Sequence, residues 1–174
     1  MPLTALEFVN TDVADLMPLR GMPLKTLVCD GCQNLSDIAP LEGLPLTRLS
    51  FYFTKVANLS PLTGMSLTSL ICGATPVADL SPLRGMPLTE LHIWSTRVSD
   101  LSPINGMPLV KLLCHNTQVT DFSLLKEMPL QRFQFDFKPE RDTKLLKSIT
   151  TLEVINEKPA AEFWKEVEKD KAQK

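Results

Sequence analysis

The 174-residue sequence lacks the features that mark several classes of protein. Four cysteines are too few for a disulfide scaffold, and no apolar run approaches the roughly 20 residues that span a bilayer. No basic segment followed by an apolar one opens the chain, so no signal peptide is expected. A net charge of −2, from 18 basic and 20 acidic residues, gives no footprint for nucleic acid or a membrane surface. We therefore expect a cytoplasmic protein whose partner is neither nucleic acid nor a membrane.

Glycine is scarce as well, and its placement reveals a repeat. Five of the seven glycines stand at one position of a recurring unit: Gly21, Gly43, Gly64, Gly85 and Gly106. The leucine that opens each copy recurs at steps of 21 or 22 residues: Leu3, Leu24, Leu46, Leu67, Leu88, Leu109 and Leu130. Self-similarity at such a period indicates a solenoid. Positions in each copy are numbered below from its opening leucine.

The first half of each copy has the alternation of a strand. In the copy LTELHIWSTRVSDLSPINGMP, Leu91 and Ile93 at positions four and six alternate with Glu90, His92 and Trp94. This period of two is expected of a strand with one buried face. Stacked copies would align these strands in a parallel sheet on the concave side of the solenoid.

The second half of each copy has the chemistry of a short turn. Ser102 is expected to be an N-cap before Pro103, and Gly106 to end a 3₁₀-like turn on the convex side. A threonine follows the strand in five of the seven copies (Thr11, Thr54, Thr75, Thr96 and Thr117), where its hydroxyl would satisfy backbone groups at the bend. An aspartate precedes most turns, where it would accept hydrogen bonds from turn amides. Asp15, Asp79, Asp100 and Asp121 form this column.

The pattern L-x-x-L-x-h-x-x-T-x-V-x-D-L-S-P-L-x-G-M-P resembles the leucine-rich repeat over roughly Leu3 to Phe137. Its D-L-S-P-L segment is similar to that of internalin-type repeats, and the fuller phrase D-L-S-P-L-x-G-M-P-L-T to planctomycete-type bacterial repeat proteins. Some of those repeats are the C-terminal part of serine/threonine kinases, but the kinase motifs are absent from this sequence. The resemblance implies an α/β leucine-rich-repeat solenoid with a binding role.

The two ends of the chain differ. Residues 1–137 are expected to form seven repeats, and residues 138–174 a cap made of a helix (ERDTKLLKSI), a last strand (TLEVIN) and an amphipathic helix (AAEFWKEVEKDK). In the last strand, Leu152 and Val154 are expected to be buried. The first copy opens in register without a cap, so its free strand edge could pair with a second copy of the chain in a homodimer.

The concave face varies between copies, and a protein partner is expected to bind there. Tyrosine and tryptophan are enriched in interface hot spots, and Tyr52 and Trp94 flank Gly73, which predicts a shallow dip between two aromatic walls. The candidate residues are Asp30, Arg48, Tyr52, Phe53, Glu90, His92, Trp94, His115 and Asp136. We expect a non-catalytic protein-binding module that needs no metal or other cofactor.

Other functions remain open at this point. The chain could be a regulatory or substrate-docking region of a larger bacterial kinase, or an enzyme that uses His92, His115 and nearby carboxylates. Cys29 and Cys32 spell C-x-x-C, but both fall at repeat positions that explain them as structural residues.

Overall fold

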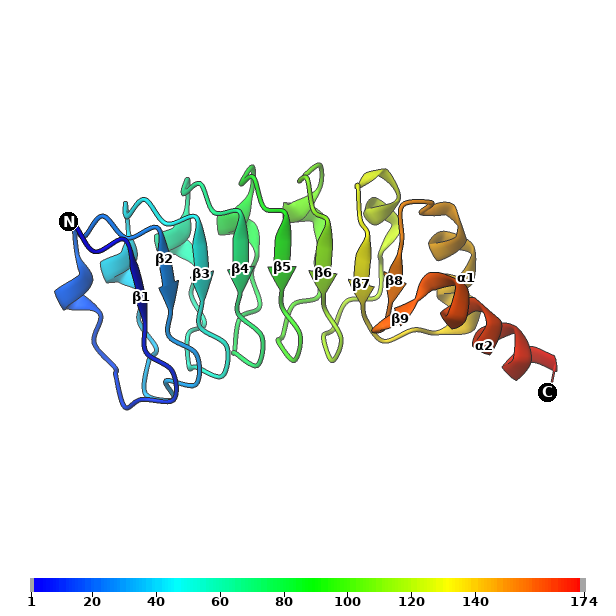
Figure 1. Ribbon diagram of the computed structural model, residues 1–174, viewed down its shortest axis with the longest axis horizontal. Helices are drawn as coiled ribbons and strands as arrows, with labels where there is room; N and C mark the ends of the chain where they lie inside the picture. Colours follow the sequence, from blue (N-terminus) through cyan, green and yellow to red (C-terminus); the bar gives the residue numbers. More distant parts are fainter. Residues whose placement is uncertain (1, 173–174) are drawn as a thin grey trace.

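The structure, a computed structural model, describes residues 2–172 as an open stack of coils with a parallel sheet along one side (Figure 1). Met1, Gln173 and Lys174, the last two at the end of the expected cap, lie outside the described residues. We number coils 1 to 7 by their opening leucines. Each coil contributes one short strand: β1 Ala5–Glu7, β2 Thr26–Val28, β3 Arg48–Ser50, β4 Ser69–Ile71, β5 Glu90–His92, β6 Lys111–Leu113 and β7 Arg132–Gln134.

The register between strands follows the repeat. Each strand pairs in parallel with the next, so that position four of every coil stands beside position four of its neighbour, as Leu91 does beside Leu70 and Leu112. These side chains point into the coil, and Leu91 is fully buried. One continuous column of leucine thus replaces the central core of an ordinary domain.

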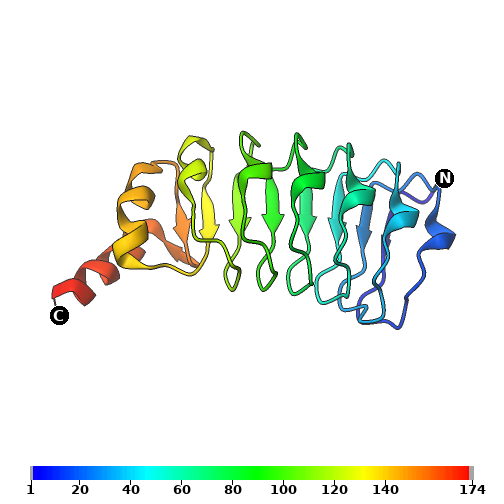
Figure 2. The ribbon, with the colours of Figure 1, turned by 180° about the vertical axis from the view of Figure 1, so that it is seen from behind.

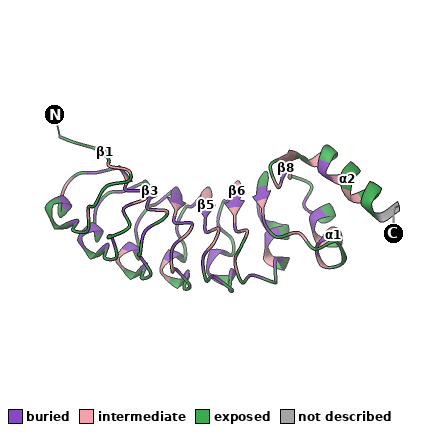
Figure 3. Ribbon diagram, turned by 90° about the horizontal axis from the view of Figure 1, so that it is seen from below, coloured by how far each residue is buried: buried purple, intermediate pink, exposed green. Residues whose placement is uncertain are grey.

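Short turns cover the opposite side of the solenoid (Figure 2). Each of the first six coils has one 3₁₀ turn there: η1 Met17–Leu19, η2 Ala39–Leu41, η3 Ser60–Leu62, η4 Ser81–Leu83, η5 Ser102–Ile104 and η6 Ser123–Glu127. Seen from below, the molecule bends with the sheet on its inner, concave side (Figure 3). The expected leucine-rich-repeat fold is therefore confirmed.

The aspartate column bonds as the sequence predicts, and so does the threonine column except at Thr11, whose hydroxyl lies 3.3 Å from Cys32 Sγ. Asp100 Oδ1 accepts a hydrogen bond from Ser102 N at 2.7 Å, and an Asp or Asn does the same at each of the six turns. The prediction that Ser102 is the N-cap is wrong, because its hydroxyl donates to Asp100 and caps no amide. Thr96 Oγ1 donates to the carbonyl of Ile93 at 2.6 Å, and Thr54, Thr75 and Thr117 repeat this bond.

The C-terminal segment closes the stack. It consists of α1 Pro139–Ser148, β8 Val154–Ile155, β9 Lys158–Pro159 and α2 Ala160–Ala172. β8 continues the parallel sheet, and β9 turns back against it as an antiparallel strand that the sequence did not predict. Phe163 and Trp164 on α2 contact Phe137, so the α2 helix seals the aromatic end of the core.

The expected phase of the last strand is wrong by one residue. Ile155 stands beside Phe133 and is fully buried, whereas Leu152 and Val154 are only half-buried. The α1 helix takes the place of the usual convex turn, so the repeat spacing no longer fixes the register here. The tight turn into β9 sets it instead, and it puts Val154 on the concave face.

Candidate protein-binding face

The concave face is made by positions three, five and seven of each coil. Position three carries most of the charge: Arg48, Glu90, Lys111 and Arg132. Position seven lies two residues beyond each strand, and in coils 3, 5 and 6 it carries Tyr52, Trp94 and His115. The face therefore has a charged row along one side and an aromatic row along the other.

Glu90 is the centre of the charged row. Its Oε1 lies 2.9 Å from Lys111 Nζ, and its Oε2 accepts a hydrogen bond from Ser69 at 3.0 Å. Arg48 is 4.0 Å from the same carboxylate and is half exposed. One carboxylate thus contacts side chains from coils 3, 4 and 6, and it ties Arg48 and Lys111 of the charged row to Glu90.

His92 is held against this carboxylate. Its Nε2 lies 3.0 Å from Glu90 Oε1, but the two atoms are not aligned for a hydrogen bond. Burial and the charge of Lys111 lower the pKa of His92 to about 4, although Glu90 acts in the opposite direction. Burial alone would raise the pKa of Glu90, but the hydrogen bonds from Lys111 and Ser69 outweigh it and lower that pKa. Near neutral pH, His92 is uncharged and Glu90 is ionised.

Four rings from coils 3, 5 and 6 make a continuous aromatic surface. The Trp94 ring centroid lies 6.2 Å from Tyr52 and 5.4 Å from Phe53, and Tyr52 and Phe53 are in edge contact. The His115 ring stacks on Trp94 at 5.8 Å, nearly parallel to it. We call Tyr52, Phe53, Trp94 and His115 the aromatic surface.

The predicted dip above Gly73 is absent because Trp94 fills it. A Cβ atom placed on Gly73 would lie 2.3 Å from Trp94 Cε2, so the indole rests directly on the glycine backbone. The missing side chain leaves a space that the indole covers, and filling it removes apolar area from water. The aromatic surface is therefore continuous where the sequence predicted two separate walls.

Phe53 is the exposed member of the aromatic surface. It is 53% exposed, and its backbone has a left-handed φ of 56°. The same position is left-handed in each of the first six coils and otherwise carries small or turn-forming residues: Asn10, Gly31, Ala74, Ser95 and Asn116. A bulky residue is rare in this conformation, which costs roughly 1–2 kcal/mol. Phe53 thus adds little to the fold.

The two candidate aspartates occupy different settings. Asp30 is only 6% exposed and accepts hydrogen bonds from Ser50 Oγ at 2.5 Å and from Tyr52 N at 3.0 Å. Burial raises the pKa of Asp30, against these hydrogen bonds. Asp136 is exposed and accepts a hydrogen bond from Asn116 N at 2.7 Å. Asp30 therefore holds the Tyr52 backbone in place, whereas Asp136 is open to a partner.

The two histidines belong to different groups of contacts. His92 faces Glu90, whereas His115 stacks on Trp94. Within residues 2–172, no three His, Cys, Asp or Glu side chains are arranged to hold a metal ion. Cys29 and Cys32 are fully buried and unpaired, and burial raises the pKa of Cys29 far above its usual range.

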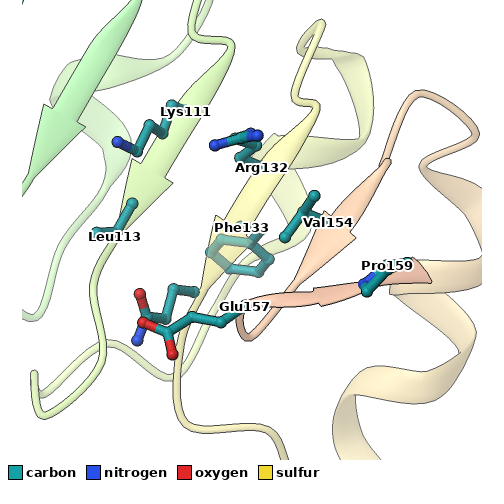
Figure 4. Close-up of a pocket in the computed structure, with 8 residues that line it drawn as sticks. Lys111, Leu113, Arg132, Phe133, Val154, Glu157 and Pro159 are labelled. Carbon is teal, nitrogen blue, oxygen red and sulfur yellow. The ribbon is translucent and has the colours of Figure 1, made fainter. Parts of the chain in front are cut away.

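A pocket at the C-terminal end of the concave face was not predicted. It has a volume of about 420 Å³ and lies between β6, β7 and the β8–β9 hairpin (Figure 4). Lys111 and Arg132 line one end, Glu157 the other, and Leu113, Val154 and Pro159 the space between. The pocket exists because β9 folds back on β8, so it could be predicted only by predicting that hairpin. The only signal for the turn in the sequence is the polar run Asn156-Glu157-Lys158 before Pro159. We call it the end pocket.

Coils of 21 or 22 residues, a parallel sheet on the concave side and 3₁₀ turns behind it define a leucine-rich-repeat solenoid. Among solved structures, internalin C2 of Listeria monocytogenes matches with 25% identity and a TM-score of 0.79, over 88% of this chain and 70% of that chain. An internalin of the same organism, inlF, matches with 24% identity and a TM-score of 0.65, over 82% of this chain and 51% of that one.

These likenesses confirm the internalin-like part of the expected resemblance, whereas a planctomycete origin and a kinase connection stay predictions. No protein-family model matches the sequence. No curated protein matches it either. No helix in the described part of the chain is long and apolar enough to cross a membrane.

Proposed function

We propose that this chain is a non-catalytic protein-binding module that holds a bacterial partner protein on its concave face. The observation that carries the proposal is Phe53, a large apolar side chain that is half exposed on a strained backbone. Its ring forms one surface with Tyr52 and Trp94, and aromatic anchors of this kind dominate the energy of protein interfaces.

The setting of the aromatic surface favours binding without rearrangement. Trp94 is held by Gly73 below it and by the His115 ring beside it. The Tyr52 backbone is fixed by Asp30. Because these rings are already ordered, a partner would lose little conformational entropy in binding them. Arg48, at the edge of the charged row, and Asp136 would supply polar contacts around the aromatic centre.

Affinity capture from cell fractions tests the proposal. Wild-type chain on a resin is compared with the Phe53→Asn variant, because Asn occupies the same backbone position in coils 1 and 6 and suits the left-handed conformation. We expect the wild type to retain a partner that Phe53→Asn loses. Tyr52→Ala/Trp94→Ala should lose it too, although that variant also removes packing over Gly73.

Met17→Asn is the matched control. Met17 is as exposed as Phe53 but lies on the convex turn η1, so its loss should leave capture unchanged. A partner retained equally by Phe53→Asn and wild type would place the binding site elsewhere.

Simple observations test the remaining predictions on location, kinase connection and catalysis. Capture from cytosolic and from secreted fractions tests the expected cytoplasmic location. The gene sequence upstream of Met1 decides whether the module belongs to a larger kinase. An enzyme that uses His92 and His115 is disfavoured, because the two rings face different partners and His92 is a weak base with a pKa of about 4.

A further inference from the structure

The end pocket contains a cation that the fold leaves without a counter-ion. Arg132 stands in register beside Lys111, and like charges on neighbouring strands repel. Lys111 is neutralised by Glu90 on its other side. Arg132 is exposed, has Val154 on its other side, and makes no side-chain hydrogen bond or ion pair with the side chains described for residues 2–170. One end of the end pocket is therefore ready to receive an anionic group.

The middle of the end pocket is apolar and faces outward. Leu113 and Val154 are half-buried, and Pro159 stands beside them on β9. Proline has no N–H to donate, so β9 is a poor template for a further strand. A polypeptide bound here must lie across the face and be recognised by its side chains.

Glu157 lines the other end of the end pocket, and its backbone is in a strained, left-handed conformation. Asn156 and Glu157 form the two-residue turn between β8 and β9, with left-handed φ values of 48° and 67°. Such turns prefer glycine at the second residue, because a side chain is strained in this conformation. The carboxylate lies opposite the Lys111 and Arg132 end (Figure 4). A negative charge is thus present where the turn alone would favour glycine.

We propose that the end pocket binds an extended segment of a partner protein by three side chains of stated character. An acidic side chain meets Arg132, an apolar one covers the floor, and a basic one meets Glu157. Since a strand rises about 3.3 Å per residue and alternate side chains share a face, the three stand at every second residue of the segment. This inference rests on the proposed function, because it names the chemistry of a partner held on the same concave face.

Selection from a random peptide library on the immobilised full chain tests the inference without the natural partner. We expect enriched peptides to carry the acidic, apolar and basic residues in alternation. No enrichment, or enriched peptides without an acidic residue, would overturn it. So would full competition by free acetate or inorganic phosphate at the same concentration as the peptide, because either ion would mark a small-anion site.

Charge reversal then ties the selected peptide to the pocket. Fluorescence polarisation with Arg132→Glu should show affinity reduced by about tenfold or more, restored by a peptide whose acidic residue is replaced by arginine. Glu157→Gly should weaken binding while raising the melting temperature. Arg20→Glu, the same reversal on the convex side, should change nothing. Equal affinity for wild type and Arg132→Glu would overturn the inference.

The two proposals fail separately. If selected peptides bind and respond to Arg132→Glu while no partner is captured from cells, the end pocket stands and the aromatic surface loses its support. If capture depends on Phe53 while the peptide selection fails, the end pocket alone is overturned.

Discussion

Trp94 lies so close to Gly73 that even a methyl group on the glycine would come within 2.3 Å of the indole. The two residues stand at the same position of adjacent coils, so the absence of a side chain in one coil sets the place of the ring in the next. Gly73 has an ordinary backbone conformation, and the close approach of Trp94 is what requires glycine there.

Gly73→Ala should therefore displace the indole and lower the free energy of unfolding by about 1–3 kcal/mol. Tryptophan fluorescence in a Trp164→Phe background, which leaves Trp94 as the one tryptophan, should shift toward a more exposed ring. The same glycine substitution made in Trp94→Ala should cost much less, because the clash is gone. An equal cost in both backgrounds would mean that the indole is not what requires the glycine.

Phe53→Asn should not lower stability, unlike most replacements of an aromatic residue. Relief of the left-handed strain, about 1 kcal/mol, offsets the loss of edge contacts with Tyr52 and Trp94. Urea unfolding measures the difference. A loss above about 2 kcal/mol would show that Phe53 is a core residue and would remove the argument that it is kept for binding.

His92 should make the fold less stable as pH falls from 7 to 5. Its pKa drops from 6.5 to about 4 on folding, so the unfolded chain takes up a proton in this range and the folded chain does not. His92→Gln should flatten this part of the stability curve. Parallel curves for variant and wild type between pH 7 and 5 would contradict the burial of His92 against Arg48, Glu90 and Lys111.

Carboxylates act on the same curve at lower pH. Glu90 has a lowered pKa, so its contribution is lost as pH falls below about 4.5. Asp30 has a raised pKa, so protonation favours its folded form and opposes this loss. Proton NMR of the His92 ring separates the histidine from both, because it follows one group directly.

Leu91→Ala should cost about 2–5 kcal/mol, since it opens a cavity in the leucine column between two packed neighbours. Leu3→Ala is the matched control, because Leu3 opens the first coil and is 49% exposed. Thermal unfolding of the two variants should differ accordingly. Similar losses would mean that the end coil is packed in solution, for example against a second copy of the chain.

The features that recur from coil to coil could be predicted from the sequence. The strand column at Leu91, the hydrogen bond of Thr96 and the turn contact of Asp100 follow from a pattern present in nearly every coil. Even here Ser102 shows a limit: the pattern marks the turn but not whether the serine or the aspartate bonds its first amide.

What occurs once was harder to predict. The contact of Trp94 with Gly73 depends on the rotamer of a ring between two coils, and Glu90 joins side chains from three coils. The phase at Ile155 depends on a turn outside the repeat. The first two features lie on the candidate binding face and the third puts Val154 there, at positions where the repeat pattern varies from coil to coil.

The stacking register of the strands also sets the geometry of recognition. The aromatic surface and the end pocket stand on one ladder of strands, roughly 4.8 Å apart at each step. The two sites share coil 6, since His115 belongs to the aromatic surface and Lys111 and Leu113 line the end pocket, so no coil can be added or removed between them. Under the proposed function, a partner that touches both sites would therefore meet them at one fixed separation, set by the packing of adjacent strands.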